Sequence, residues 1–241
     1  MARRRFFVDE VRSGHATVSG EEAHHLTRVL RVEAGQKYEI SDNRQVYLAE
    51  VETARKDAVT FTIVEKLAAT EPLVRPVVLA ALIKFDRFEW LVEKATELGA
   101  HAIIPFVADR SEKGLDRAAP GRLVRWRKIA REASEQSRRQ LLPELHEVTQ
   151  FDDALRYEAA YRLALEEISG APPILATLPS QRCAGETVGI LVGPEGGWTG
   201  REREAMRDAG WMAASLGQNI LRAETAAAAA LAIVSAAWAV T

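Results

Sequence analysis

Between residues 77 and 240, short apolar segments alternate with segments of helical periodicity, and this alternation limits the possible folds more than any other feature. Residues 77–83 are all apolar, which suits a strand buried on both faces. A helix is expected to begin at Asp86 and to end at Gly99. The other expected strands cover 102–107, 161–165, 187–192 and 212–216, and the other expected helices cover 120–138, 151–158, 199–209 and 224–240. Strands that alternate with helices predict an α/β fold with a mostly parallel sheet and helices on both faces.

The first 72 residues follow a different pattern, in which apolar and polar residues alternate along short segments. This period of two predicts three strands, separated by turn-forming residues, at 37–41, 45–53 and 58–66. One helix is expected at 21–31, where Ser19 and Glu22 have the spacing of a capping box. The prediction is a small β-barrel domain over residues 1–72, followed after a proline-containing segment by an α/β domain over residues 73–241.

The charges of the chain are balanced overall but not along its length. It carries 32 basic and 34 acidic residues, a formal net charge of -2, which argues against a uniformly basic nucleic-acid-binding protein. Arginine makes up 25 of the basic residues. It suits bidentate recognition of phosphates and bases, although a GC-rich genome also encodes many arginines. Residues 110–140 hold ten basic and four acidic residues, so this segment is either a solvated helix face or a nucleic-acid-binding surface.

Several basic side chains are candidates for binding RNA phosphates. Besides a basic arm at residues 3–5, they are His24, Arg28, Arg31, Arg138 and Arg139. The first three have the spacing i, i+4, i+7, which places them on one face of a helix. The last two lie at the end of the helix expected at 120–138. His24 and His25 are not expected to bind a metal together, because adjacent helix residues point about 100° apart.

What the chain lacks excludes several protein classes. Its one cysteine, Cys183, cannot form an internal disulfide or a cysteine-based zinc site, and it fits a reducing compartment. No apolar segment follows the basic N-terminus, so no signal peptide is expected. The longest uncharged segment, residues 226–240, is too short for a membrane span. We therefore expect a cytoplasmic protein with no membrane association and no bound metal.

Two glycine-containing loops follow expected strands of the α/β domain. Residues 193–197, with the sequence GPEGG, come directly after one strand, and Thr199 with Glu202 then has the spacing of a capping box. Residues 216–221 join another strand to the last helix. Glycines at the carboxyl ends of strands let backbone amides approach a ligand, although a tight structural turn would also use them. The first loop lacks the Gly-Lys-Ser/Thr of a P-loop, and Pro194 departs from a dinucleotide fingerprint.

These two loops are expected to form a cleft, because the carboxyl ends of parallel strands meet at one edge of a sheet. Arg222 and Glu224 place one positive and one negative side chain at the start of the last helix. A purely structural alternative is that Glu224 complements the positive end of the helix dipole and that Arg222 pairs with the nearest carboxylate.

Five segments of the chain together resemble one known family. They are HHLTRVLRVEAGQ, FDRFEWLVEKATELGAHAIIPF, REASEQSRRQLLPEL, GPEGGWTGRE and SLGQNILRAETAAAAA. In this order they resemble the ribosomal small-subunit methyltransferase E family, of the SPOUT class of RNA methyltransferases, along nearly the whole chain. Residues 170–186 look like a variable connection and carry none of the resemblance.

The resemblance implies a SPOUT fold with a C-terminal trefoil knot, preceded by a small PUA-like RNA-binding β-barrel, and it implies a homodimer. The activity that it implies is methylation of N3 of a uridine in 16S ribosomal RNA, with S-adenosylmethionine as cofactor. The partner would be small-subunit ribosomal RNA or the assembled 30S subunit. The residues that it assigns to the cofactor are Leu165, Gly193, Pro194, Glu195, Gly196, Gly197, Leu216, Gly217, Leu221 and Thr225.

Methylation of uridine N3 requires that this nitrogen lose its proton before it attacks a methyl group. The reaction needs proximity, a proton acceptor and stabilisation of the uridine anion, but no metal. We expect Arg222 to stabilise the anion and Glu224 to accept the proton, with Glu135 as the second candidate. Covalent methylation at C5 would need a cysteine nucleophile, and Cys183 in the variable connection does not suit that role. Two other functions stay open: a SPOUT methyltransferase acting on a ribose 2′-oxygen or on tRNA, and a non-catalytic RNA-binding or ribosome-assembly module.

Overall fold

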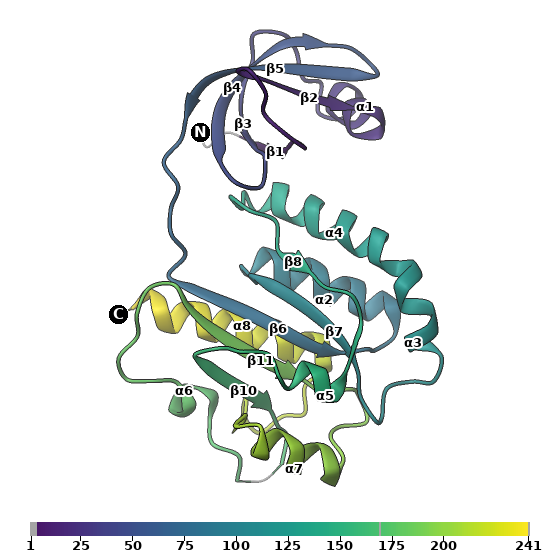
Figure 1. Ribbon diagram of the computed structural model, residues 1–241, viewed down its shortest axis with the longest axis vertical. Coiled ribbons are helices and arrows are strands. Elements are labelled where there is room, and N and C mark those ends of the chain that lie inside the picture. Colours follow the sequence, from purple (N-terminus) through teal and green to yellow (C-terminus); the bar gives the residue numbers. More distant parts are fainter. Residues whose placement is uncertain (1–3, 169, 241) are drawn as a thin grey trace. The chain divides into compact units, whose positions relative to one another are not determined.

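The computed structural model describes residues 4–168 and 170–240, and these residues form two compact units. The first unit consists of the described residues up to Thr70 together with Ser134–Leu142. The second unit consists of Glu71–Ala133 together with the described residues from Pro143 onward. Figure 1 labels the helices and strands of both. The first unit therefore includes a short segment from much later in the chain, which the sequence does not predict.

The first unit is built around a five-stranded sheet in the order β1-β3-β4-β5-β2. Its elements are β1 (Arg5–Phe7), β2 (His15–Ser19), α1 (Gly20–Arg28), β3 (Lys37–Ser41), β4 (Val46–Ala54) and β5 (Ala58–Lys66). Strand β1 pairs with β3 in parallel, and the other pairs are antiparallel. The buried core includes Phe6, Val18, Leu26, Ile40 and Phe61. Strands β3, β4 and β5 agree with the prediction, whereas β1 and β2 were not predicted.

Helix α1 is shorter than predicted, because it ends at Arg28 rather than three residues later. Arg31 has a φ of 52°, in the left-handed region, and the amide of Val32 donates a hydrogen bond to the carbonyl of Leu26. Arg31 therefore does not share a helix face with His24 and Arg28, and this part of the prediction is wrong.

The capping box predicted at the start of α1 is also wrong. Ser19 is the N-cap residue, but its side chain makes no capping hydrogen bond. Gly20, the first residue of the helix, has a φ of 66° and donates its amide to the carbonyl of Asp57. Because this left-handed residue turns the chain at the helix start, the Ser19 side chain does not reach the amide that a capping box requires.

The second unit contains a seven-stranded sheet in the order β12-β10-β11-β6-β7-β8, with β9 also paired to β7. The strands are β6 (Val74–Ala81), β7 (Ala102–Val107), β8 (Glu144–Leu145), β9 (Thr149–Gln150), β10 (Tyr161–Leu165), β11 (Glu186–Val192) and β12 (Met212–Ala214). Each pairing described in this sheet is parallel. The carboxyl ends of the strands therefore lie at one edge, and the loops after the adjacent strands β10, β11 and β12 come together there.

Helices cover both faces of this sheet (Figure 1), which confirms the predicted α/β fold. They are α2 (Phe85–Glu97), α3 (Leu115–Ala118), α4 (Leu123–Gln136), α5 (Phe151–Ala154), α6 (Ile174–Thr177), α7 (Gly200–Asp208) and α8 (Ala223–Ala239). One core contains Leu91 of α2 and Leu231 of α8, and the other contains Phe151 of α5, Met206 of α7 and Trp198. The many alanines of α8 let it pack closely on β6, β11 and α2.

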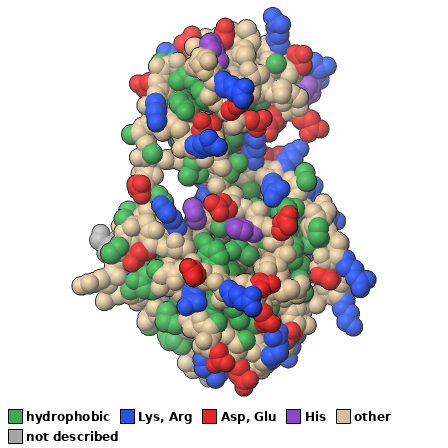
Figure 2. All heavy atoms as spheres, viewed as in Figure 1, with side chains coloured by type: hydrophobic (Ala, Val, Ile, Leu, Met, Phe, Trp, Pro, Cys, Tyr) green, Lys and Arg blue, Asp and Glu red, His purple; other side chains and the backbone are tan. Residues whose placement is uncertain are grey.

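Some element boundaries differ from the prediction. In place of the single helix expected at 120–138, three elements follow one another. Helix α3 comes first, then a 3-10 turn over Ala119–Arg122 that contains Pro120, and then helix α4. The chain has left the helix by Arg138, whose φ of 56° is left-handed. No helix in the described part of the chain is long and apolar enough to cross a membrane. On the face shown in Figure 2, acidic and basic side chains are interspersed in both units, in keeping with the near-neutral net charge of -2.

Candidate active site

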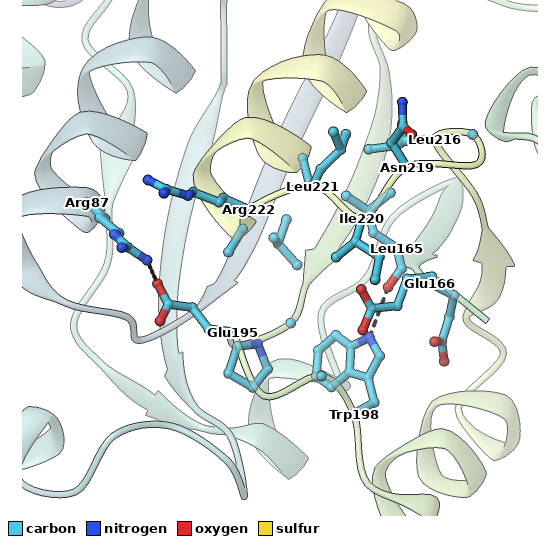
Figure 3. A pocket seen from close by; sticks show the side chains of 18 of the residues that line it. Arg87, Leu165, Glu166, Glu195, Trp198, Leu216, Asn219, Ile220, Leu221 and Arg222 are labelled. Carbon is cyan, nitrogen blue, oxygen red and sulfur yellow. Dashed lines mark hydrogen bonds and ion pairs between the residues drawn. The ribbon is translucent and has the colours of Figure 1, made fainter.

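A pocket of the second unit opens at the carboxyl edge of the sheet, where three loops meet (Figure 3). These loops follow β10, β11 and β12, and they contribute lining residues from within 165–167, 192–198 and 216–223. Arg87 of α2 and Arg203 of α7 also line the pocket. The cavity volume of about 340 Å³ is large enough for a small organic ligand.

The floor of the pocket is fixed by Trp198, which is 3% exposed. Its indole nitrogen donates a hydrogen bond of 2.9 Å to the carbonyl of Leu165, and its ring stacks on Phe106 with an interplanar angle of 3°. A Cβ atom added at Gly193 would lie only 2.9 Å from a ring carbon of Trp198. Glycine is therefore required at residue 193 by the close approach of the indole ring.

Four of the charged side chains that line the pocket form two ion pairs. Arg87 pairs with Glu195 of the GPEGG loop (Figure 3). Arg203 makes a two-pronged contact with Glu166, through Nε to Oε1 at 2.9 Å and Nη2 to Oε2 at 3.2 Å. Its third nitrogen, Nη1, donates to the carbonyl of Trp198. The first pair ties the loop after β11 to α2, and Arg203 ties α7 to Glu166 after β10 and to Trp198 in the loop after β11.

Two further charged side chains of the pocket, Glu167 and Arg222, have no ion pair within the described ranges. Arg222 is exposed and is the N-cap residue of α8. Its side chain extends to the side of the pocket where Arg87 and Glu195 lie, whereas Leu165 and Ile220 lie on the opposite side (Figure 3). Charged side chains line both sides of the pocket, because Glu166 follows Leu165 directly, and Arg222 is the cation near Arg87 that has no ion pair within the described residues.

Comparison with known sequences identifies the family. A family described as "RNA methyltransferase domain" matches residues 70–235, and one described as "RNA methyltransferase PUA domain" matches residues 18–64. The chain is 35% identical over 234 residues to the Ribosomal RNA small subunit methyltransferase E of Bacillus subtilis, covering 91% of this chain and 89% of the relative. This chain belongs to the ribosomal RNA small subunit methyltransferase E family. The predicted family is confirmed, as are the predicted PUA domain and the α/β methyltransferase domain with a mostly parallel sheet.

Solved structures of similar proteins agree with this family. The Neisseria gonorrhoeae Ribosomal RNA small subunit methyltransferase E, bound to S-adenosyl methionine, matches with a TM-score of 0.85 and 29% identity over 98% of each chain. A putative methyltransferase from Legionella pneumophila, in complex with the same cofactor, matches with a TM-score of 0.87 and 27% identity over 98% of each chain.

The pocket of this methyltransferase E family member brings together most of the residues that the resemblance assigned to the cofactor. They are Leu165, Gly193, Pro194, Glu195, Gly197, Leu216, Gly217 and Leu221. Gly196 and Thr225 do not line it. The carbonyl of Gly196 accepts a hydrogen bond of 2.8 Å from Nη1 of Arg110, and Thr225 is exposed in the first turn of α8.

The two candidate proton acceptors lie in different units. Glu224, in the first turn of α8, is 7% exposed, and its Oε2 atom is buried without a hydrogen-bond partner within residues 4–168 and 170–240. It does not line the pocket. Glu135 belongs to the first unit, where its carboxylate accepts a hydrogen bond of 3.3 Å from the amide of Phe7.

The RNA-binding candidates are all residues of the first unit. His24 is half-buried, whereas Arg28, Arg31 and Arg138 are exposed. Burial lowers the pKa of Arg139 to about 10, and its Nε atom donates to the carbonyl of Leu141. Arg3, from the expected basic arm, lies outside the described residues.

Sequence reasoning missed the pocket residues Arg87, Glu166, Glu167 and Arg203. A signal for two of them was present, because Glu166 and Glu167 follow β10 directly, and residues just after parallel strands gather at one edge of a sheet. No comparable signal marks the two arginines, which lie inside helices.

Contacts from the start of α7 and from the loop after β7 also hold the GPEGG loop in place. The predicted capping box of α7 is confirmed, with Thr199 and Glu202 each accepting a hydrogen bond from the other's backbone. Glu202 is fully buried and also accepts the amide of Asp109, in the loop after β7. Hydrogen bonds from Arg201 lower the pKa of Asp109. The neighbouring Arg110 then reaches the carbonyl of Gly196.

Replacing Gly193 by alanine is expected to lower the free energy of unfolding by about 1–3 kcal/mol, because the added methyl group overlaps the buried ring of Trp198. Gly200→Ala is the matched control, since a Cβ atom there meets nothing within 4 Å. Urea denaturation of both variants measures the difference. A Gly193→Ala protein as stable as the Gly200→Ala protein would show that the loop can move away from the indole ring.

Proposed function

We propose that this chain transfers a methyl group from S-adenosylmethionine to N3 of a uridine in 16S ribosomal RNA. The observation that carries the proposal is the pocket, which is lined both by a glycine loop held against Trp198 and by Arg222, whose guanidinium has no ion pair among the residues that the structure describes. The similarity to ribosomal RNA small subunit methyltransferases supports the RNA class, and the S-adenosyl methionine bound in the structures from Neisseria and Legionella supports the cofactor. The choice of N3 as the methylated atom is the more specific part of the proposal, because the names of these relatives state no position on the base.

The residues present fit S-adenosylmethionine. Gly193 leaves the loop backbone bare where any side chain would strike Trp198, so that backbone groups are available to a ligand. Leu165, Leu216 and Leu221 supply apolar contacts that suit a purine ring. When bound, S-adenosylmethionine supplies an electrophilic methyl group. The protein then has to bind the uridine, accept its N3 proton and stabilise the negative charge.

Arg222 suits the stabilisation of that charge. Its guanidinium lines the pocket, carries a permanent positive charge and has no carboxylate partner within the described chain. A fixed positive group is most effective where negative charge develops during the reaction.

Glu224 is the proposed proton acceptor, directly or through water. Its buried Oε2 atom makes no hydrogen bond in the described structure, so it is free to accept one. Glu135 is the second candidate, but its carboxylate already accepts the amide of Phe7.

We further propose that the first unit, a PUA-like domain, binds RNA phosphates through His24, Arg28, Arg31, Arg138 and Arg139. The family match to an RNA methyltransferase PUA domain over residues 18–64 supports an RNA-binding role for this unit. The C-terminal trefoil knot, the homodimer and the cytoplasmic location stay predictions from the resemblance.

The target position is tested by incubating the purified protein with S-adenosylmethionine and 30S subunits, or naked 16S RNA, from a strain that lacks this modification. Digestion to nucleosides and mass spectrometry are expected to give 3-methyluridine from one of the two substrates. A 2′-O-methylated nucleoside, or methylation of tRNA alone, would contradict the N3 assignment and keep the methyltransferase class. Absence of S-adenosylmethionine binding by calorimetry would instead favour a non-catalytic RNA-binding module.

A further inference from the structure

Glu167 lies at the junction of the two glycine-containing loops. It follows β10 by two residues, and β10 pairs with both β11 and β12, the strands that lead into these loops. Its Oε1 atom would be 3.3 Å from a Cβ atom added at Gly197, whose φ of 67° is left-handed. The carboxylate is therefore held against the backbone of the GPEGG loop, on the surface of the pocket.

Glu167 differs from the other acidic residues of the pocket in its interactions. Glu166 is occupied by Arg203, and Glu195 is occupied by Arg87. Glu167 is exposed and has neither an ion pair nor a side-chain hydrogen bond within the described part of the chain. An ionised carboxylate has about four lone-pair sites, so both of its oxygens are available to a ligand in the pocket.

The position of Glu167 in the sheet indicates which ligand group it would bind. In dinucleotide-binding α/β folds, a glycine loop follows one parallel strand, and an acidic residue at the carboxyl end of a nearby strand accepts a hydrogen bond from a ribose hydroxyl. Here the GPEGG loop follows β11, and Glu167 follows the adjacent parallel strand β10. Two carboxylate oxygens can accept both hydroxyl groups of a vicinal diol.

We propose that Glu167 accepts hydrogen bonds from the ribose hydroxyls of the cofactor's nucleoside and thereby selects a ribonucleoside. This assignment rests on the proposed use of S-adenosylmethionine, and it deepens that function by giving a cofactor-specificity role to a residue outside the predicted set. Glu167 has no role in the methyl transfer itself.

The test is calorimetric titration with 5′-methylthioadenosine, which keeps the ribose but lacks the amino-acid part of the cofactor, and with its 2′-deoxy analogue. The wild-type protein is expected to bind the deoxy analogue about 10- to 100-fold more weakly, because it loses a hydrogen bond to a charged acceptor. Glu167→Ala is expected to bind 5′-methylthioadenosine more weakly by a similar factor and to distinguish the two nucleosides by less than about 3-fold. Glu204→Ala, at an exposed position of α7 outside the pocket, is the matched control and should behave as wild type.

Two results would overturn the assignment while leaving the proposed function intact. One is a Glu167→Ala protein that binds S-adenosylmethionine normally and still distinguishes the two nucleosides as wild type does. The other is a variant that loses affinity for S-adenosylmethionine but not for 5′-methylthioadenosine, since the carboxylate would then bind the ammonium group. A wild-type protein that binds neither S-adenosylmethionine nor 5′-methylthioadenosine would overturn the proposed function, and the Glu167 assignment with it.

Discussion

Arg222→Ala is expected to lower the rate constant of methyl transfer by about 100- to 1,000-fold, the range for removal of one preorganised group that stabilises negative charge. The effect should appear in kcat, because Arg222 interacts most strongly with charge that forms only during the reaction. Arg222 is exposed and has no ion-pair partner in the described chain, so its removal should leave stability unchanged. Single-turnover methylation measures the rate, and calorimetry with S-adenosylmethionine and filter binding of RNA measure the two affinities.

Two further variants separate this role from a general effect of positive charge. Arg222→Lys keeps the charge but loses the planar, two-pronged donor geometry, so it should recover only part of the rate. Arg207→Ala removes another exposed arginine, in α7 and outside the pocket, and should methylate at the wild-type rate. An Arg222→Ala protein that binds both substrates normally and methylates at full rate would show that the anion is stabilised by another group.

The sequence could predict the elements of this fold because its apolar patterns are local. The segment at 77–83 and the segments at 102–107, 161–165 and 187–192 all correspond to strands of the parallel sheet. The order of these strands is not a local property. It places β11 beside β6, more than a hundred residues earlier in the chain, and no periodicity in either strand specifies this neighbour.

The two predicted capping boxes show where local patterns fail. Both have a hydroxyl residue three positions before a glutamate, yet only the box of Thr199 and Glu202 forms. At the other site, Gly20 adopts a left-handed conformation as its amide bonds to Asp57, in the turn between β4 and β5. Both sequences satisfy the same local rule, and a tertiary contact at one of them prevents the capping box from forming.

The candidate site was predictable where it depends on loops and less so where it depends on ion pairs. Glycines directly after strands indicated the pocket, and eight of the ten residues assigned to the cofactor line it. Arg87 and Arg203 form ion pairs with carboxylates that lie 108 and 37 residues away in the sequence, and nothing in their local sequence indicates these pairs. The segment Ser134–Leu142 likewise joins the first unit through distant contacts, such as that of Glu135 with the amide of Phe7.

Arg203→Leu is expected to destabilise the second unit by about 3 kcal/mol, the largest stability effect among these variants. The Glu166 side chain is only 4% exposed, so losing Arg203 leaves a buried carboxylate without its cation. The change also removes a donor from the carbonyl of Trp198, next to the pocket floor. Urea unfolding followed by tryptophan fluorescence measures the effect, because all five tryptophans lie in the second unit.

The double variant Glu166→Leu/Arg203→Leu identifies the source of this loss. Replacing both partners of a buried ion pair by apolar residues is often neutral, so the double variant should recover most of the stability that Arg203→Leu loses. Arg207→Ala, one helical turn further along α7, is exposed and should change the free energy of unfolding by less than about 0.5 kcal/mol. An Arg203→Leu protein with wild-type stability would mean that water reaches Glu166 and replaces the guanidinium. A double variant as unstable as the single variant would mean that packing around Trp198, rather than the unpaired carboxylate, sets the loss.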